Sequence, residues 1–160
     1  MITRDLELEK AIKSDAVIIV DTCSVLEGSF QSFANRAAPL LSSTKKKLVV
    51  PKVVLHEILK NSKKPSLENW ARIASRIINE LYEQGLVLIA GDELEPGFGD
   101  VVFLSNVLKQ FLSTDVVVIT QDKKLTHDLL SFNDLQSVQS RHRICVYKLA
   151  NHGFLELGTY

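Results

Sequence analysis

The sequence predicts an α/β sandwich built on a mainly parallel central sheet. Short apolar runs rich in Val and Ile alternate along the chain with longer segments in which apolar residues recur every three or four positions. Uninterrupted apolar runs are typical of parallel strands buried on both faces, and their alternation with amphipathic helices is typical of βαβ units. Five runs are predicted to be strands: Ala16–Val20, Leu48–Val50, Leu86–Ile89, Val116–Ile119 and Ile144–Tyr147.

Amphipathic helices are predicted between these strands. The clearest pattern covers residues 70–81, where apolar residues recur at three- and four-residue steps, with Ser66 as a suitable N-cap and Gly85 as a typical stop. A second amphipathic pattern covers residues 101–112, and a third follows Asp122. Helices in these places would pack on the faces of the predicted sheet.

Three segments give weak patterns: the charged N-terminal stretch through Lys13, the connection 42–47 and the acidic, glycine-rich loop Gly91–Gly99. The loop leads into Asp100 and is a candidate lid or substrate-facing edge, because functional residues are often placed on loops. No repeat or Pro/Gly/Ser-rich linker divides the 160 residues, a length typical of one compact domain. We therefore expect a single domain over residues 1–160.

Composition narrows the class of protein further. Nineteen basic and nineteen acidic residues cancel, so net charge predicts no bulk attraction to nucleic acid. Cys23 and Cys145 are the two cysteines, and without a signal-peptide pattern they favour a reducing, cytoplasmic setting, or a nuclear one in a eukaryote. The apolar runs are shorter than the roughly 20 residues of a membrane helix, so we expect no membrane partner.

Four carboxylates are the candidate catalytic and metal-binding residues. Asp21 directly follows the first strand, Asp122 follows the fourth, and Glu57 lies in the helix predicted after the second. Ligands of open parallel sheets bind beyond the carboxyl ends of the strands, and Asp100 can point to the same edge from the start of its helix. Each acid alone has a structural alternative, since aspartates favour caps and strand ends and Glu57 could lie on a helix surface.

Converging carboxylates repel one another and need cations to ionise together. Oxygen ligands suit one or two Mg²⁺ or Mn²⁺ ions, which would activate a water for attack on a phosphodiester. No Ser-His-Asp or Cys-His arrangement can be assembled from the sequence. The histidines are scattered and do not suggest a zinc site; they are His56, His127, His142 and His152.

The order of these acids resembles that of PIN-domain nucleases over residues of about 15–148. Each acid lies in a segment similar to a family motif, and Thr22, Ser24 and Thr120 are the supporting residues that the motifs imply. Cys23 stands where the family has Asn or Ser, and the adjacent Ser24 is the expected substitute. The motif segments are Val20–Leu26, Val50–Lys60, Phe98–Asp100 and Val118–Leu125.

The resemblance implies a three-layer α/β/α sandwich and a Mg²⁺- or Mn²⁺-dependent endonuclease that acts on single-stranded RNA, with DNA as the other substrate class. The segments around Glu57 and Asp122 look closer to RNA-decay endonucleases than to short toxins of this family. The third motif has fewer acids than usual. Asp92, Asp115 and Asp128 are possible extra acids, but they do not lie in segments that resemble a family motif.

Local basic clusters are the candidate contacts for RNA phosphates. We expect binding through lysines placed on the same helices as Glu57 and Asp122, although solvated surface lysines are an equal alternative for each cluster. The proposed residues are Lys60, Lys63, Lys64, Lys123 and Lys124.

Three competing functions are weighed at this stage. A PIN-like fold could bind RNA or a protein without cutting, although a silent binder has no reason to keep a repulsive cluster of acids. A toxin paired with an antitoxin would share the chemistry, and a homodimer or another protein partner is also open. A phosphate-handling enzyme of the haloacid dehalogenase type is disfavoured, because it needs an aspartate where Cys23 stands.

Overall fold

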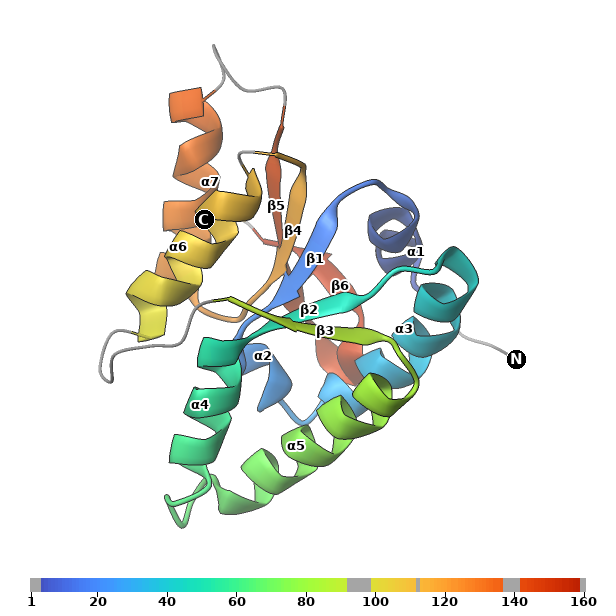
Figure 1. Ribbon diagram of the computed structural model, residues 1–160, viewed down its shortest axis with the longest axis vertical. Helices are drawn as coiled ribbons and strands as arrows, with labels where there is room; N and C mark the ends of the chain where they lie inside the picture. The colour runs from blue at the N-terminus through green and yellow to red at the C-terminus, as the bar shows by residue number, and fades with distance from the viewer. Residues whose placement is uncertain (1–3, 92–98, 112, 137–141, 159–160) are drawn as a thin grey trace.

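The computed structural model describes residues 4–91, 99–111, 113–136 and 142–158, apart from the side chains of 99–102, 105, 108, 135 and 136 (Figure 1). Its centre is a six-stranded sheet in the order β3-β2-β1-β4-β5-β6. All neighbouring pairs are parallel except β5 and β6. The strands are β1 (Val17–Val20), β2 (Leu48–Pro51), β3 (Val87–Ala90), β4 (Val116–Ile119), β5 (Ile144–Leu149) and β6 (Leu155–Leu157).

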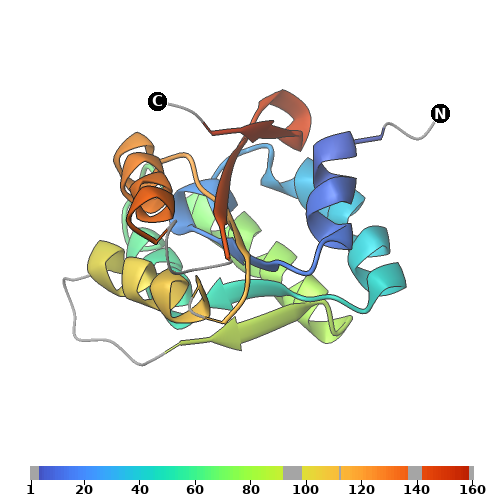
Figure 2. The same ribbon diagram turned by 90° about the horizontal axis from the view of Figure 1, so that it is seen from above.

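Helices cover both faces of this sheet. Helices α6 and α7 lie on one side, and α1, α3 and α5 lie on the other (Figures 1 and 2). The predicted three-layer α/β/α sandwich with a mainly parallel sheet is therefore confirmed. The described helices are α1 (Leu6–Lys13), α2 (Thr22–Val25), α3 (Phe30–Thr44), α4 (Lys52–Asn61), α5 (Glu68–Glu83), α6 (Gly99–Phe111) and α7 (Lys123–Gln136), with a short 3-10 turn at Asn151–Gly153.

The central strands explain why the sequence shows uninterrupted apolar runs. All four residues of β4 are buried, as are three of the four in β1, because helices pack on both of their faces. Burying a Val or Ile side chain fully contributes about 1.5–3 kcal/mol relative to leaving it exposed. Polar residues inside these strands would forfeit that contribution.

Strand register determines where the polar residues that follow the strands lie. Val20 is paired with Ile119, so β1 and β4 end side by side. The amide of Asp21 continues the ladder by donating to the carbonyl of Ile119 at 3.0 Å. The carboxyl ends of the two central strands therefore deliver Asp21 and Thr120 to the same edge of the sheet.

The N-terminal stretch that gave a weak pattern forms a regular helix, α1. Asp5 caps it, accepting from the amide of Leu8 at 3.1 Å through Oδ1, while Oδ2 accepts from the amide of Leu155 at 2.8 Å. Leu8, Ala11 and Ile12 are buried beneath the charged face. A contact with a residue 150 positions away fixes this helix, which is why its local sequence did not reveal it.

Other boundaries also differ from those expected. The region 42–47 is not a loop throughout, because α3 continues to Thr44. Ser66 is not the N-cap of α5, since Leu67 occupies that position without a side-chain hydrogen bond. The stop at Gly85 is confirmed by its positive φ of 75° directly after the helix. No helix in the described ranges has the length and apolar character of a membrane span.

Candidate active site

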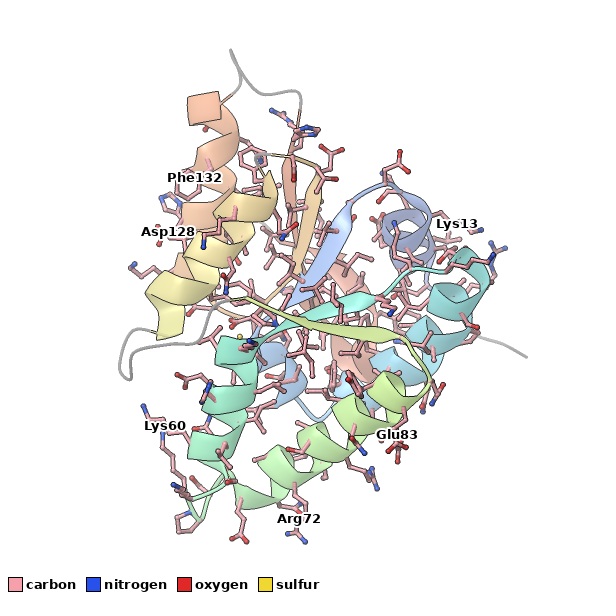
Figure 3. All side chains as sticks on the ribbon, in the orientation of Figure 1. Lys13, Lys60, Arg72, Glu83, Asp128 and Phe132 are labelled. Atoms are coloured by element: carbon pink, nitrogen blue, oxygen red, sulfur yellow. The ribbon has the colours of Figure 1, made fainter. Side chains whose placement is uncertain are left out.

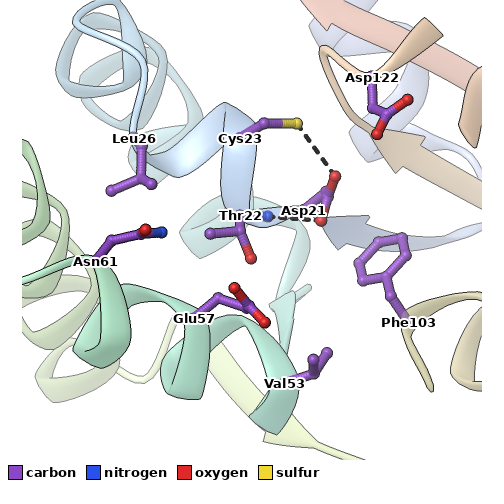
Figure 4. A pocket seen from close by; sticks show the side chains of 9 residues that line it. All are labelled: Asp21, Thr22, Cys23, Leu26, Val53, Glu57, Asn61, Phe103 and Asp122. Carbon is purple, nitrogen blue, oxygen red and sulfur yellow. Dashed lines mark hydrogen bonds between the residues drawn. The ribbon is translucent and has the colours of Figure 1, made fainter. Parts of the chain in front are cut away.

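Three of the four predicted acids line one pocket at the carboxyl edge of the sheet (Figure 4). Its volume is about 200 Å³. Asp21 and Asp122 approach it from the ends of the central strands, and Glu57 reaches it from α4. The remaining lining residues are Thr22, Cys23, Leu26, Val53, Asn61 and Phe103.

Each aspartate also caps the helix that follows it. Oδ1 of Asp21 accepts from the amide of Thr22 at 2.7 Å at the start of α2. Oδ1 of Asp122 accepts from the amide of Leu125 at 3.0 Å at the start of α7. Capping and a role in the pocket are therefore compatible, because each cap uses one carboxylate oxygen and holds the side chain in a fixed orientation.

Thr120 links the two aspartates. Its hydroxyl, in a side chain only 1% exposed, donates to Oδ2 of Asp21 at 2.9 Å and accepts from the amide of Asp122 at 3.1 Å. One hydroxyl therefore sets the position of both acids relative to each other. The structure thus places Thr120 as an ordering residue of the turn between β4 and α7.

Cys23 makes the contacts for which Ser24 was the expected substitute. The thiol donates to Oδ2 of Asp21 at 3.1 Å and accepts from the amide of Gln121 at 3.3 Å. Burial and then the charge of Asp21 raise the pKa of the Cys23 thiol to about 12, so the sulfur stays protonated as a donor. Ser24 does not line the pocket, and its buried hydroxyl has no hydrogen-bond partner within the described structure.

Gln121 was not recognised in the sequence as a site residue. Its side-chain amide pairs with the backbone of Leu149, with Oε1 accepting at 2.7 Å and Nε2 donating at 2.9 Å. These bonds tie the turn that bears Asp122 to strand β5. The only sequence signal was an amide side chain between two polar residues directly after a buried strand.

Glu57 lies on the face of α4 that it shares with Val53 and Asn61, at four-residue spacing. Its side chain is half-buried and points toward Thr22 across the pocket (Figure 4). Val54 and Ile58 pack inward whereas Leu59 is 62% exposed, and the half-buried carboxylate of Glu57 lies in the pocket wall. This placement removes most of the desolvation cost expected for an acid in an apolar helix.

Asp100 stands in the first turn of α6, but its side chain lies outside the described part of the structure. Phe103, one turn further along α6, lines the pocket, so this helix begins close to the other acids. Asp92 also lies outside the described residues. Asp115 accepts from the amide of Arg143 at 2.8 Å and Asp128 pairs with Lys124 at 3.2 Å, both away from the pocket.

The donor set in the pocket fits a hydrated Mg²⁺ or Mn²⁺ ion. Within the described ranges, no three His, Cys, Asp or Glu side chains are close enough together to enclose one ion. Mg²⁺ does not need such a cage, because it keeps several waters and binds through one or two carboxylates plus substrate phosphate. None of the four histidines lines the pocket, and a closed zinc site would need such ligands.

The lysines lie on either side of the pocket and none of them lines it. Lys60 is in the last turn of α4, whereas Lys63 and Lys64 follow the helix in a turn, contrary to the expectation that they share the helix of Glu57. The helix ends at Asn61, with Ser62 in the C-cap position. Lys123 and Lys124 open α7 and are exposed, with Lys124 paired to Asp128.

If the pocket cleaves RNA as the sequence motifs imply, replacing Thr120 with Val should lower the cleavage rate by about 10- to 100-fold, the usual effect of losing a residue that orients a ligand. It should also cost roughly 1–3 kcal/mol of stability, because the part-buried amide of Asp122 loses its acceptor and Oδ2 of Asp21 loses one of its two side-chain donors. Thr120→Ser keeps the hydroxyl and should restore turnover. Steady-state kinetics and thermal melts of both variants test this; unchanged kcat in a folded Thr120→Val protein would contradict it.

Fold and site together define an α/β protein with an acidic pocket at the switch between its central strands. A family model described as PIN domain matches residues 18–153, and the chain belongs to the PIN-domain family, whose members are generally nucleases. Its fold is similar to that of the PIN domain endonuclease Utp24, with a TM-score of 0.53 and 19% identity over 89% of this chain and 92% of that chain. No curated protein sequence matches the chain.

Proposed function

We propose that this protein is a metal-dependent endoribonuclease that hydrolyses phosphodiester bonds of single-stranded RNA. The observation that supports it most is that Asp21, Glu57 and Asp122, from three separate segments, line one pocket in a PIN fold. A family member that only bound RNA would gain nothing from three acids that repel the phosphate backbone. Catalysis with a cation explains their presence.

The residues at the pocket have different roles in this proposal. Asp21, Glu57, Asp122 and Asp100 would hold one or two Mg²⁺ or Mn²⁺ ions, which supply an activated water and stabilise charge on the phosphate. Thr120 and Cys23 keep the carboxylate of Asp21 oriented, since both donate to its Oδ2. The carboxylate of Glu57, on the opposite wall, can accept the proton that the attacking water loses.

Purified protein incubated with single-stranded RNA and DNA of the same base sequence, each labelled at one end, tests the proposal. With Mn²⁺ we expect internal cleavage of the RNA, while the DNA stays largely intact. Binding of RNA without cleavage under any divalent ion would instead identify a silent PIN domain. Preferential cutting of DNA would show that the assigned substrate class is wrong.

The exposed lysines beside the pocket should set the salt dependence of RNA binding. A triple Ala variant of Lys63, Lys64 and Lys123 should bind more weakly and with a flatter slope of log affinity against log salt, because a protein that neutralises fewer phosphates releases fewer counterions. The slope should fall by about 0.7 for each phosphate of a single strand that is no longer neutralised. Anisotropy titrations at several salt concentrations measure it, with a Lys13→Ala variant as control. An unchanged slope would show that these lysines do not contact the RNA phosphates.

A further inference from the structure

Trp70, the single tryptophan of the chain, is 42% exposed near the start of α5. Its six-membered ring lies against the backbone of Gly28, because a Cβ placed at Gly28 would come within 3.3 Å of Cη2 and 3.4 Å of Cζ3. The lack of a side chain at Gly28 lets the ring rest on the turn between α2 and α3. The indole is therefore held at one edge while much of its surface faces solvent.

The acidic pocket extends toward this ring. Its walls are α2 and α4, and it runs from Asp122 and Phe103 at the sheet to Leu26 and Asn61 at the other end (Figure 4). Gly28 is two residues beyond Leu26, a separation of at most about 7 Å between their Cα atoms. Trp70 therefore stands just past the end of the pocket that is remote from the sheet.

The same corner of the molecule carries an excess of positive charge. Figure 3 shows Lys60 and Arg72 on the helices that meet there, and the turn between those helices holds Lys63 and Lys64. Lys64 is joined directly to the start of α5, since its carbonyl accepts from the amide of Glu68 at 2.9 Å. In residues 26–30 and 58–72, four basic side chains stand against only two acidic ones, Glu27 and Glu68.

We propose that Trp70 is a stacking platform for an unpaired base of the RNA strand whose phosphate is cleaved in the acidic pocket. The inference rests on the proposed function and adds the path of the RNA strand. The RNA follows the groove between α2 and α4 toward Gly28. An exposed aromatic face beside backbone-binding cations is the arrangement with which proteins hold single strands irrespective of sequence. The lysines of the α4–α5 turn bind the adjacent phosphates.

Fluorescence provides a direct test, because all tryptophan emission comes from Trp70. The Asp21→Asn protein, which should cut RNA only very slowly, is titrated with a single-stranded RNA oligonucleotide, and binding is followed separately by anisotropy of a labelled copy. Stacking should quench the emission and protect it from acrylamide in proportion to occupancy. Saturated RNA binding without any change in emission or acrylamide access would overturn the proposal.

Variants test the energetic contribution of the same ring. Trp70→Ala should weaken RNA binding by about tenfold or more, the loss expected for one base–aromatic stack, and Trp70→Phe should retain most of the affinity. Tyr82→Ala is the matched control, because Tyr82 is 53% exposed on the same helix but at its far end, and it should bind normally. If Trp70→Ala does not fold, the RNA affinity of Trp70→Phe and the quenching of Trp70 fluorescence by RNA test the proposal instead.

The outcomes separate this inference from the proposed function. Wild-type cleavage of RNA together with unchanged binding by folded Trp70→Ala would reject the platform and leave the nuclease assignment standing. A chain that neither binds nor cuts RNA would reject both. Equal losses in Trp70→Ala and Tyr82→Ala would also reject the platform, because the effect would then not be local to the ring.

Discussion

Replacing Asp21 with Asn should reduce RNA cleavage by at least about a hundredfold, more than the 10- to 100-fold typical of a residue that only orients a metal ligand. The substitution removes one of the three described acidic charges of the pocket and replaces Oδ2 with an amide. Thr120 and Cys23 both donate to that oxygen, at 2.9 and 3.1 Å, and an amide nitrogen accepts neither bond. Rate measurements on end-labelled RNA at saturating Mn²⁺ provide the test.

The fold should survive this change. Asn caps helices as well as Asp does, so the bond from the amide of Thr22 to Oδ1 can persist. Removing one of several repelling charges should offset the lost hydrogen bonds in full, and we expect the melting temperature without metal to stay the same or rise slightly. Asp122→Asn should behave alike, because Asn can keep the cap on the amide of Leu125.

Asp128→Asn is the matched control for both variants. Asp128 is an acid on α7 that pairs with Lys124 outside the pocket, so its loss should leave the rate unchanged. Strong cleavage by Asp21→Asn would show that the pocket is not the catalytic site. A large loss of stability in EDTA for both pocket variants would identify the two aspartates mainly as structural caps.

The parallel strands could be predicted because their burial leaves a strong local pattern. Strand β4 must be apolar at every position, since helices cover both faces. Strand β6 has no such pattern: it has three residues, two of them exposed, and pairs only with β5. Helix α1 likewise depends on the tertiary bond between Asp5 and Leu155. Dependence on distant partners therefore explains why β6 and α1 were missed.

In the candidate site, too, features with a local sequence pattern could be predicted and features that depend on distant contacts could not. Asp21 and Asp122 could be predicted to lie close together because the ends of parallel strands meet at one edge. The role of Cys23 could not, because a thiol is a weak donor on its own and becomes useful here only through contacts with Asp21 and Gln121. Gln121 itself accepts a hydrogen bond from the amide of Leu149 in β5, 28 residues further along the chain. Neither spacing nor composition indicates this contact.

Removing divalent metal should abolish cleavage entirely, which is the largest effect expected for this protein. Asp21, Glu57 and Asp122 offer only oxygen ligands, and without a cation their charges repel both one another and the RNA phosphate. Mg²⁺ and Mn²⁺ match such ligands and can each keep several waters at about 2.0 to 2.2 Å. EDTA should therefore stop the reaction, and either ion added in excess should restore it.

Zn²⁺ should not support cleavage as Mn²⁺ does, because it prefers thiolate and imidazole ligands. The pocket holds a single sulfur, that of Cys23, and no histidine. Since the described acids do not form a closed ligand cage, the ions should bind loosely without substrate and be lost on dialysis. Activity titrations with each ion measure which ion supports cleavage. Metal analysis of the dialysed protein measures whether the ion is retained. Retention of stoichiometric Zn²⁺ through EDTA dialysis, or activity with Zn²⁺ and not with Mn²⁺, would show that the ligand set has been wrongly assigned.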